Sequence, residues 1–179
     1  MWAASEAGGQ MRHVTSYTVC AASGELGPKR REGDRQVPEG FYTIQYLWPN
    51  SAFYLSMKVG YPNHSDRILG DKRMPGSDIM IHGGCASIGC LAMSDERIEE
   101  LWVMGLAANE RSRIAVHLFP TRDPAALAEH PDYGKHRDFW DNIYQGHELF
   151  EADNTMMIFG DAKEVLQSLL AELKEAAAA

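Results

Sequence analysis

The chain has 179 residues, which is enough for one domain with a sizeable hydrophobic core. Its 17 basic and 25 acidic residues leave a formal net charge of −8, without the basic surplus that binding to a nucleic-acid duplex requires. No apolar run approaches the roughly 18 residues that a membrane-spanning helix needs, and no signal peptide is visible. We therefore expect a globular protein with no nucleic-acid partner and no transmembrane segment.

The first two thirds of the chain favour β-structure. Runs rich in β-branched and aromatic side chains predict strands at 12–20, 40–48, 52–59, 78–82 and 113–119. The clearest is 52–59, where apolar and polar side chains alternate as in a half-buried strand. Residues 61–77 are typical of a loop. Cys20, at the end of the first run, is interpreted as a small core residue.

One helix is expected inside this β-region and more helix after it. Ser94 is a good N-cap, and apolar side chains then recur with helical spacing at Ile98, Leu101, Trp102 and Gly105. A second apolar stripe falls at Phe139, Trp140, Ile143, Tyr144, His147 and Phe150. A strand at 155–160 and a capped helix from 161 complete the chain. Such stripes indicate core or docking faces rather than cofactor sites.

The predicted class is α+β, with a mostly β domain followed by a helical extension. We place the domain at 12–120 and the extension at 121–179. Residues 1–11 are interpreted as a disordered or non-native N-terminal segment. No internal repeat is visible, and the only biased run is the alanine-rich end of the chain.

A small basic cluster stands out before the second predicted strand. The stretch "GPKRREGDR" contains Lys29, Arg30 and Arg31 around a glycine-proline turn. Charge runs are usually solvated loops. Cations beside a site can instead hold a carboxylate, so these three residues are also candidates for binding an acidic substrate.

The stretch "IMIHGGCASIGCLAMSD" over 79–95 carries the candidate chemistry. His82, Cys85 and Cys90 could bind zinc with His117 as a fourth ligand, although the paired short spacings of structural zinc sites are missing. His117 is otherwise interpreted as an ordinary strand residue. A Cys85–Cys90 disulfide would close a tight loop. Ser87 sits in a stretch resembling a nucleophile elbow, but Cys85 replaces the first glycine.

A cysteine nucleophile accounts for more of these residues. His82 ends a predicted strand, and Cys90 follows eight residues later, just before the predicted helix. The intervening glycines permit the chain to loop back, so that an imidazole can meet the thiol and activate it. Gly89 lets backbone N–H groups approach a developing oxyanion. A glycine-rich turn with buried thiols and no catalysis remains the plain alternative.

At these residues the sequence resembles a known family. "IHGGCASIGCLAMSD" is similar to the His-Gly…Ser-x-Gly-Cys signature of the L,D-transpeptidase catalytic domain (YkuD) family, in its YafK-type murein branch. Further stretches resemble that branch in the same order: "LGPKRREGDRQVPEGFYTI", "YLSMKVGYPNHSDR", "AVHLFPTR" and "FWDNIYQGHELFE". The resemblance covers roughly 12–151 and implies a YkuD-like fold.

The resemblance also implies roles for individual residues. Cys90 matches the nucleophile, His82 the general base, Gly89 the glycine beside the nucleophile, and Ser87 the serine or threonine of the signature. Ile88 stands where most of the wider family has a second histidine, which leaves the support of the oxyanion open. Cys85 has no catalytic counterpart.

The implied activity is cysteine-dependent acyl transfer on peptidoglycan stem peptides, without a cofactor or metal. Transfer to an amine would form a cross-link, and transfer to water would hydrolyse bonds at meso-diaminopimelate, including the link of a lipoprotein to murein. The implied location is the periplasm or cell envelope. The competing interpretation is a catalytically silent peptidoglycan-binding module.

Overall fold

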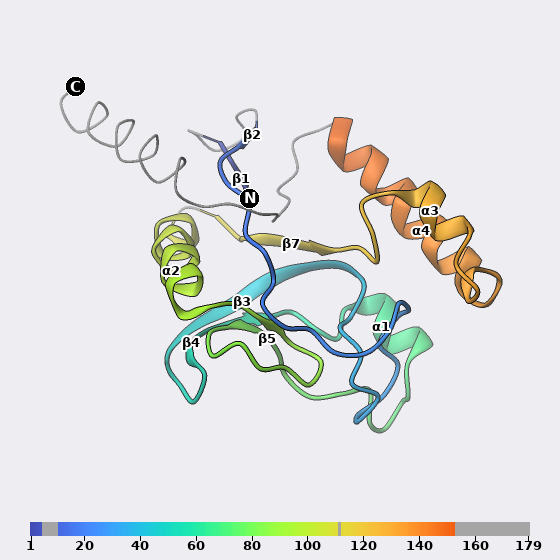
Figure 1. The fold of residues 1–179 in the computed structure, drawn as a ribbon, viewed down its shortest axis with the longest axis horizontal. Coiled ribbons are helices and arrows are strands. Elements are labelled where there is room, and N and C mark those ends of the chain that lie inside the picture. The colour runs from blue at the N-terminus through green and yellow to red at the C-terminus, as the bar shows by residue number, and fades with distance from the viewer. Residues whose placement is uncertain (5–10, 111, 153–179) are drawn as a thin grey trace.

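The computed structural model describes residues 1–4, 11–110 and 112–152, and for 149–152 the backbone only (Figure 1). Its centre is a five-stranded sheet in the order β6-β5-β4-β3-β7. The strands are β3 (Gly40–Ser51), β4 (Tyr54–Val59), β5 (Ile79–His82), β6 (Leu91–Ala92) and β7 (Ala115–Leu118). All neighbours are antiparallel except β5 and β6, which are parallel. The expected α+β class is confirmed, and four of the five predicted strands are present.

The predicted strand at 12–20 is wrong for most of its length. Only Arg12–His13 forms a strand, β2, which pairs with β1 (Trp2–Ala3) in a separate two-stranded sheet. The end of the run lies along β6 instead, where the N–H groups of Cys20 and Ala21 both donate to the Ala92 carbonyl. The run is rich in β-branched residues, but its backbone N–H and C=O groups make isolated contacts rather than a continuous β-ladder.

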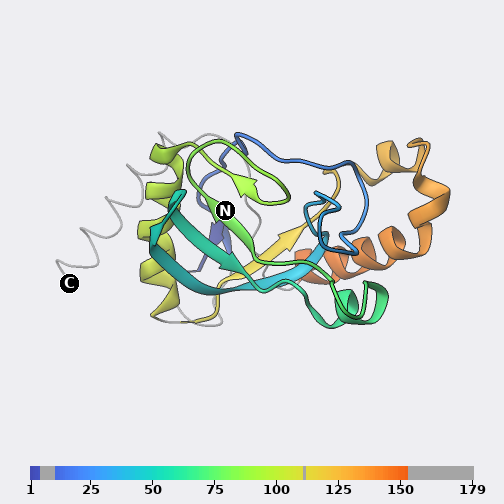
Figure 2. The same cartoon turned by 90° about the horizontal axis from the view of Figure 1, so that it is seen from below.

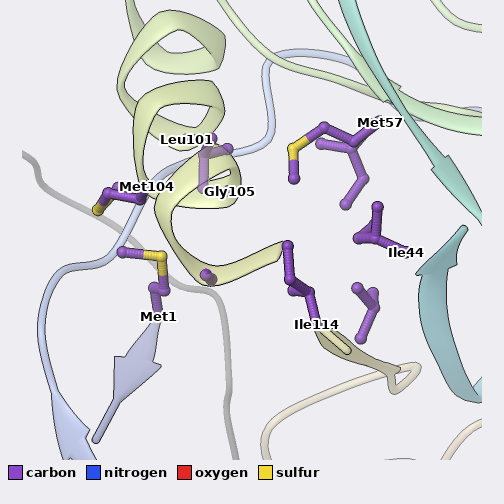
Figure 3. A pocket seen from close by; sticks show the side chains of 10 residues that line it. Met1, Ile44, Met57, Leu101, Met104, Gly105 and Ile114 are labelled. Atoms are coloured by element: carbon purple, nitrogen blue, oxygen red, sulfur yellow. The ribbon is translucent and has the colours of Figure 1, made fainter. Parts of the chain in front are cut away.

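Helix α2 (Asp95–Asn109) is the helix predicted after Cys90, and it packs on the apolar face of the sheet. Its buried residues are the expected four, Ile98, Leu101, Trp102 and Gly105. Ser94 occupies the N-cap position, but its side chain makes no capping hydrogen bond. A cavity of about 30 Å³ lies between α2 and the sheet, and side chains such as Met57 and Leu101 line it (Figure 3). The described side chains that line this cavity are all apolar, so this face is part of the hydrophobic core.

The expected loop at 61–77 contains a short helix, α1 (His64–Leu69). Asn63 and Asp66 form a reciprocal capping box at its start. The Asp66 carboxylate also accepts a hydrogen bond of 2.9 Å from the Tyr42 hydroxyl, although Asp66 is almost fully buried. Six residues are too few for an apolar period to show, so the sequence pattern did not reveal this helix.

Helices α3 (Pro124–Ala128) and α4 (Tyr133–Ala152) lie at the opposite end of the sheet from α2, as two views show (Figures 1 and 2). Trp140 anchors α4, because it is fully buried and its indole N–H donates to Glu39 at 2.7 Å. Trp140 and Ile143 confirm the predicted apolar stripe. The predicted strand at 155–160 and helix from 161 lie outside the described residues, as do any contacts of Phe150.

Within the described residues, no helix has the length and apolar content needed to cross a bilayer.

Candidate functional site

Strands β4 and β5 carry one apolar and one polar face. Ser56 pairs with His82 and Lys58 pairs with Met80, so these side chains share a face. The alternate residues, Met57 and Ile81 among them, belong to the core under α2. Three polar side chains of this face are shielded from solvent, because Ser56 is 1%, Lys58 5% and His82 2% exposed. A buried polar face of this kind is typical of a functional site rather than of a solvated sheet surface.

The loop after β5 returns the chain to the same face. Gly84 and Gly89 have φ values of +79° and +99°, a region that L side chains rarely adopt. Strand β6 then runs parallel to β5, with His82 opposite Ala92. Continuing this register backward by two residues places Cys90 beside Met80, on the face that carries His82. The glycines thus allow the reversal that the sequence suggested.

Cys90 is the free thiol of this face and is partly exposed. Its Sγ accepts a hydrogen bond of 3.4 Å from the Met80 N–H and lies 3.9 Å from the Asp78 carbonyl oxygen, to which the thiol can donate. Burial raises the pKa of the Cys90 thiol, while the Met80 N–H and the ammonium groups of Lys58 and Lys29 act in the opposite direction. Burial therefore favours the neutral thiol over the thiolate.

The His82 ring is fixed by its own neighbour. Nδ1 lies 2.6 Å from the carbonyl oxygen of Gly83, and because that oxygen can only accept, Nδ1 carries the hydrogen. Nε2 is then the basic nitrogen. The ring packs against Phe53, with centroids 4.7 Å apart. Among the described residues no hydrogen bond joins His82 to Cys90, which are offset by two strand residues, about 7 Å.

Ser87 and Gly89 organise the backbone of the nucleophile. The Ser87 hydroxyl accepts from the Cys90 N–H at 2.8 Å and donates to the Cys90 carbonyl at 2.6 Å. The Gly89 N–H donates to the Ser23 hydroxyl at 2.6 Å. Both amides expected to face an oxyanion thus already have hydroxyl partners. Ser87 has no histidine partner among the described residues, so nothing supports it as a nucleophile.

The three cysteines pair differently from the expectation. Cys20 and Cys85 form a disulfide, with alpha carbons 5.3 Å apart, which leaves Cys90 free. The alternative of a Cys85–Cys90 disulfide is therefore contradicted, and Cys20 is an exposed cross-link rather than the core residue that was expected. The zinc interpretation fails for the same reason, because an oxidised Cys85 has no thiolate to offer a metal.

His117 lies away from this site. It sits on β7, at the opposite edge of the sheet from β6, and its ring meets Phe41 edge-on at 4.9 Å. Burial, with a smaller contribution from His147, lowers the pKa of His117 to about 4. It is a neutral strand residue, as expected, and not a fourth ligand.

The basic cluster is folded around one carboxylate. Asp34 accepts from the Lys29 ammonium at 2.5 Å and from the N–H groups of Arg30 and Arg31 at 2.8 and 2.9 Å. Lys29 is only 5% exposed, so it is not the solvated side chain that a charge run suggests. The Arg30 guanidinium lies 5.0 Å over the Phe139 ring. Of the three cations, only Arg31 is exposed.

Four residues near the site were not singled out from the sequence: Ser23, Phe53, Lys58 and Asp78. The sequence did indicate the position of Lys58, because the period-two pattern places it on the same strand face as Ser56. His82 shares that face through its pairing with Ser56. Ser23 and Phe53 gave none, since only the fold brings them to 82–90. Ile88 is 80% exposed, and its side chain has no hydrogen-bond donor to offer the thiol.

Comparisons with known proteins identify the family. The family model described as "L,D-transpeptidase catalytic domain" (YkuD) matches residues 5–136. Two Escherichia coli proteins, from strains K12 and O157:H7, both named "Putative L,D-transpeptidase YafK", are each 38% identical over 148 residues. The match covers 80% of this chain and 59% of each relative, so the chain spans well under two thirds of their length.

Two solved structures also resemble the chain, at lower similarity. The helical cell shape determining protein Pgp2 from Campylobacter jejuni has a TM-score of 0.45 and 21% identity, covering 57% of this chain and 37% of its own. Bd1075 from Bdellovibrio bacteriovorus has a TM-score of 0.38 and 20% identity, covering 65% of this chain and 44% of its own. With the family model matching well over half of the sequence, the chain belongs to the L,D-transpeptidase catalytic domain (YkuD) family.

Proposed function

We propose that the protein catalyses acyl transfer on peptidoglycan stem peptides, with Cys90 as nucleophile and His82 as general base. The observation that carries this proposal is that a free thiol and an oriented imidazole lie on the same face of the sheet. Cys90 is the one cysteine outside the disulfide, its Sγ is held by the backbone of 78–80, and the oriented His82 imidazole shares the face. Membership of the family supplies the substrate class.

The reaction begins from a neutral thiol. Substrate must fill the space between Sγ and Nε2 or draw the two together, because no hydrogen bond links them in the resting state. Nε2 of His82 takes the proton, and the sulfur attacks the carbonyl carbon at the L-centre of meso-diaminopimelate. The C–N bond breaks, the proton passes to the leaving amine, and a thioester on Cys90 remains. An incoming amine then gives a cross-link, and water gives hydrolysis.

The oxyanion would be stabilised by a backbone N–H that gives up its present hydroxyl acceptor. The Ser87 hydroxyl bonds to both the N–H and the carbonyl of Cys90, so the Cys90 N–H is harder to free than an amide with a single hydrogen bond. The Gly89 N–H has a single bond, to Ser23. We infer that the developing oxyanion displaces the Ser23 hydroxyl and takes the Gly89 hydrogen bond.

The proposed location is the periplasm or cell envelope. Disulfides persist in oxidising compartments, and Cys20–Cys85 fits that setting. A lipoprotein linked to murein is a proposed further substrate, because its link ends at the same meso-diaminopimelate centre. Arg31 is the proposed contact for a stem carboxylate, with Lys29 and Arg30 shaping the loop that presents it.

Incubation with purified sacculi tests the proposal. Product masses are read for the wild type, Cys90→Ala and His82→Gln, with His64→Gln as an exposed histidine control. We expect a cross-linked, trimmed or lipoprotein-free product from the wild type and the control only. Unmodified sacculi in every reaction, together with retained binding to them, would favour the silent binding module. Equal product from Cys90→Ala would remove the nucleophile.

A further inference from the structure

Lys58 lies two strands away from Cys90 in a single row across the sheet. It pairs with Met80 on β5, and the Met80 N–H donates to the Cys90 Sγ at 3.4 Å. Lys58 is 5% exposed, an unusual state for a lysine in a strand. The row therefore places a buried ammonium on the face of the thiol, with only one residue between them.

The Lys58 ammonium is held by three oxygens. Its Nζ lies 3.0 Å from the Val59 carbonyl, 3.4 Å from the Tyr61 carbonyl and 3.2 Å from the Asp78 carboxylate. A buried cation needs such partners to remain charged. Because the Asp78 side chain is 64% exposed, its carboxylate is screened by water and offsets only part of the lysine's charge.

Asp78 also touches the thiol through its backbone. Its carbonyl oxygen lies 3.9 Å from Sγ, and two residues later Met80 gives Sγ its N–H. The ion pair to Lys58 thus fixes one end of the segment that holds the sulfur. The other charged groups near Cys90 are Lys29, which is paired with Asp34, and the Asp78 carboxylate. Lys58 is the cation in the same row of neighbouring residues, Lys58–Met80–Cys90, across the sheet.

We propose that Lys58, held in place by the Val59 and Tyr61 carbonyls, is a positioning residue that stabilises the thiolate form of Cys90 as it develops. The inference rests on Cys90 acting as a nucleophile and does not depend on which peptide it attacks. Within a poorly solvated face, a fixed positive charge attracts the thiolate more strongly than water-screened charges do. The raised pKa of the thiol reflects burial, and Lys58 is the first ammonium that opposes it.

The alternative is a purely structural lysine that fills a polar gap in the sheet. The two roles differ in what happens when each partner is neutralised. If Lys58 acts on the thiol's charge, removing its ammonium disfavours the thiolate, whereas removing the Asp78 carboxylate favours it. If the pair is only structural, both changes loosen the same backbone and act in the same direction.

The pH dependence of Cys90 alkylation by iodoacetamide separates these roles without any substrate. The oxidised protein is used, since Cys20 and Cys85 then do not react, and the adduct is quantified by mass spectrometry. The midpoint of the rate profile reports ionisation, and its high-pH plateau reports access to the sulfur. Lys72→Met is the control, because Lys72 is exposed just after α1 and its ammonium donates to the backbone carbonyls of Arg67 and Ile68.

We expect Lys58→Met to slow alkylation at pH 7 about tenfold with a similar plateau. Lys58→Arg and Lys72→Met should stay near the wild-type rate, and Asp78→Asn should react faster than the wild type. An unchanged midpoint in a folded Lys58→Met, or slower reaction in both Lys58→Met and Asp78→Asn, would overturn the proposal. Should Lys58→Met fail to fold, Asp78→Asn decides alone, with an unchanged or slower rate overturning it. Failure here with intact sacculus activity would leave the proposed function standing.

Discussion

Ser87 holds the backbone of Cys90 at both of its polar groups, accepting from the N–H at 2.8 Å and donating to the carbonyl at 2.6 Å. This closes a small ring directly before β6 and sets where the Cys90 side chain leaves the chain. A serine expected from the family signature to be near the chemistry therefore acts here on the nucleophile's backbone.

Replacing Ser87 with alanine should lower both stability and turnover. Two hydrogen bonds are lost and the part-buried Cys90 N–H is left unpaired, at a cost of about 1–3 kcal/mol. Because the thiol is then less well placed, we expect kcat on stem peptides to fall more than KM changes. Ser87→Thr keeps the hydroxyl and serves as the matched control. Full turnover in Ser87→Ala, measured with muropeptides and followed by mass, would show that this ring does not matter.

The Cys20–Cys85 disulfide should contribute strongly to stability. It closes a loop with a sequence separation of 65 residues. Restricting the unfolded chain over that length contributes on the order of 4 kcal/mol in the loop-entropy description. A Cys20→Ser/Cys85→Ser double variant should therefore unfold at clearly lower denaturant concentration than the wild type.

Denaturant unfolding with and without a reductant measures this contribution. The reductant should shift the wild-type midpoint toward that of the double variant and leave the double variant itself unchanged. Coinciding midpoints for wild type and double variant would mean that the hydrogen bonds to Ala92 hold the segment without the cross-link.

The sequence predicted the strand that ends at His82, the helix that follows Cys90, and the residues that α2 buries. These depend on local periodicity and on a chain reversal of eight residues. It could not predict which cysteine Cys85 joins, because the partner lies in an irregular segment that only the fold brings to β6. The burial of Lys58 was equally hidden, since an alternating strand normally turns its charged residues to water.

The offset between Cys90 and His82 was not predictable either. The sequence spacing of His82 and Cys90 shows that the two residues can lie close together. The register of β5 and β6 decides how far they are offset along the strands. That register depends on Ala92 pairing with both His82 and Ala21, contacts that come from different parts of the chain.

Stability should fall as the pH drops below neutrality because of His117. Burial lowers its pKa in the folded protein to about 4, below the ordinary value of 6.5. The unfolded chain therefore binds a proton first, so the stabilisation is complete above about pH 6.5 and is lost as the pH falls toward 4. Partial exposure reduces the effect to about 1–2 kcal/mol.

Replacing this histidine tests the linkage. His117→Gln should flatten the pH dependence of the unfolding free energy between pH 6.5 and 4, while His64→Gln, at an exposed position, should leave it as in the wild type. Identical pH slopes in His117→Gln and wild type would show that other groups cause the acid loss.

A carbapenem should acylate Cys90 and so report the nucleophile directly. Opening of the lactam ring by the sulfur adds the whole reagent mass to the protein, and peptide mapping should place that mass on the Cys90 peptide. Cys90→Ala should gain no mass. His82→Gln should still react but about 100-fold more slowly, because the proton of a neutral thiol then has no base to accept it. Equal rates in wild type and His82→Gln would mean that the imidazole plays no part, and that its position on the face of Cys90 serves the fold alone.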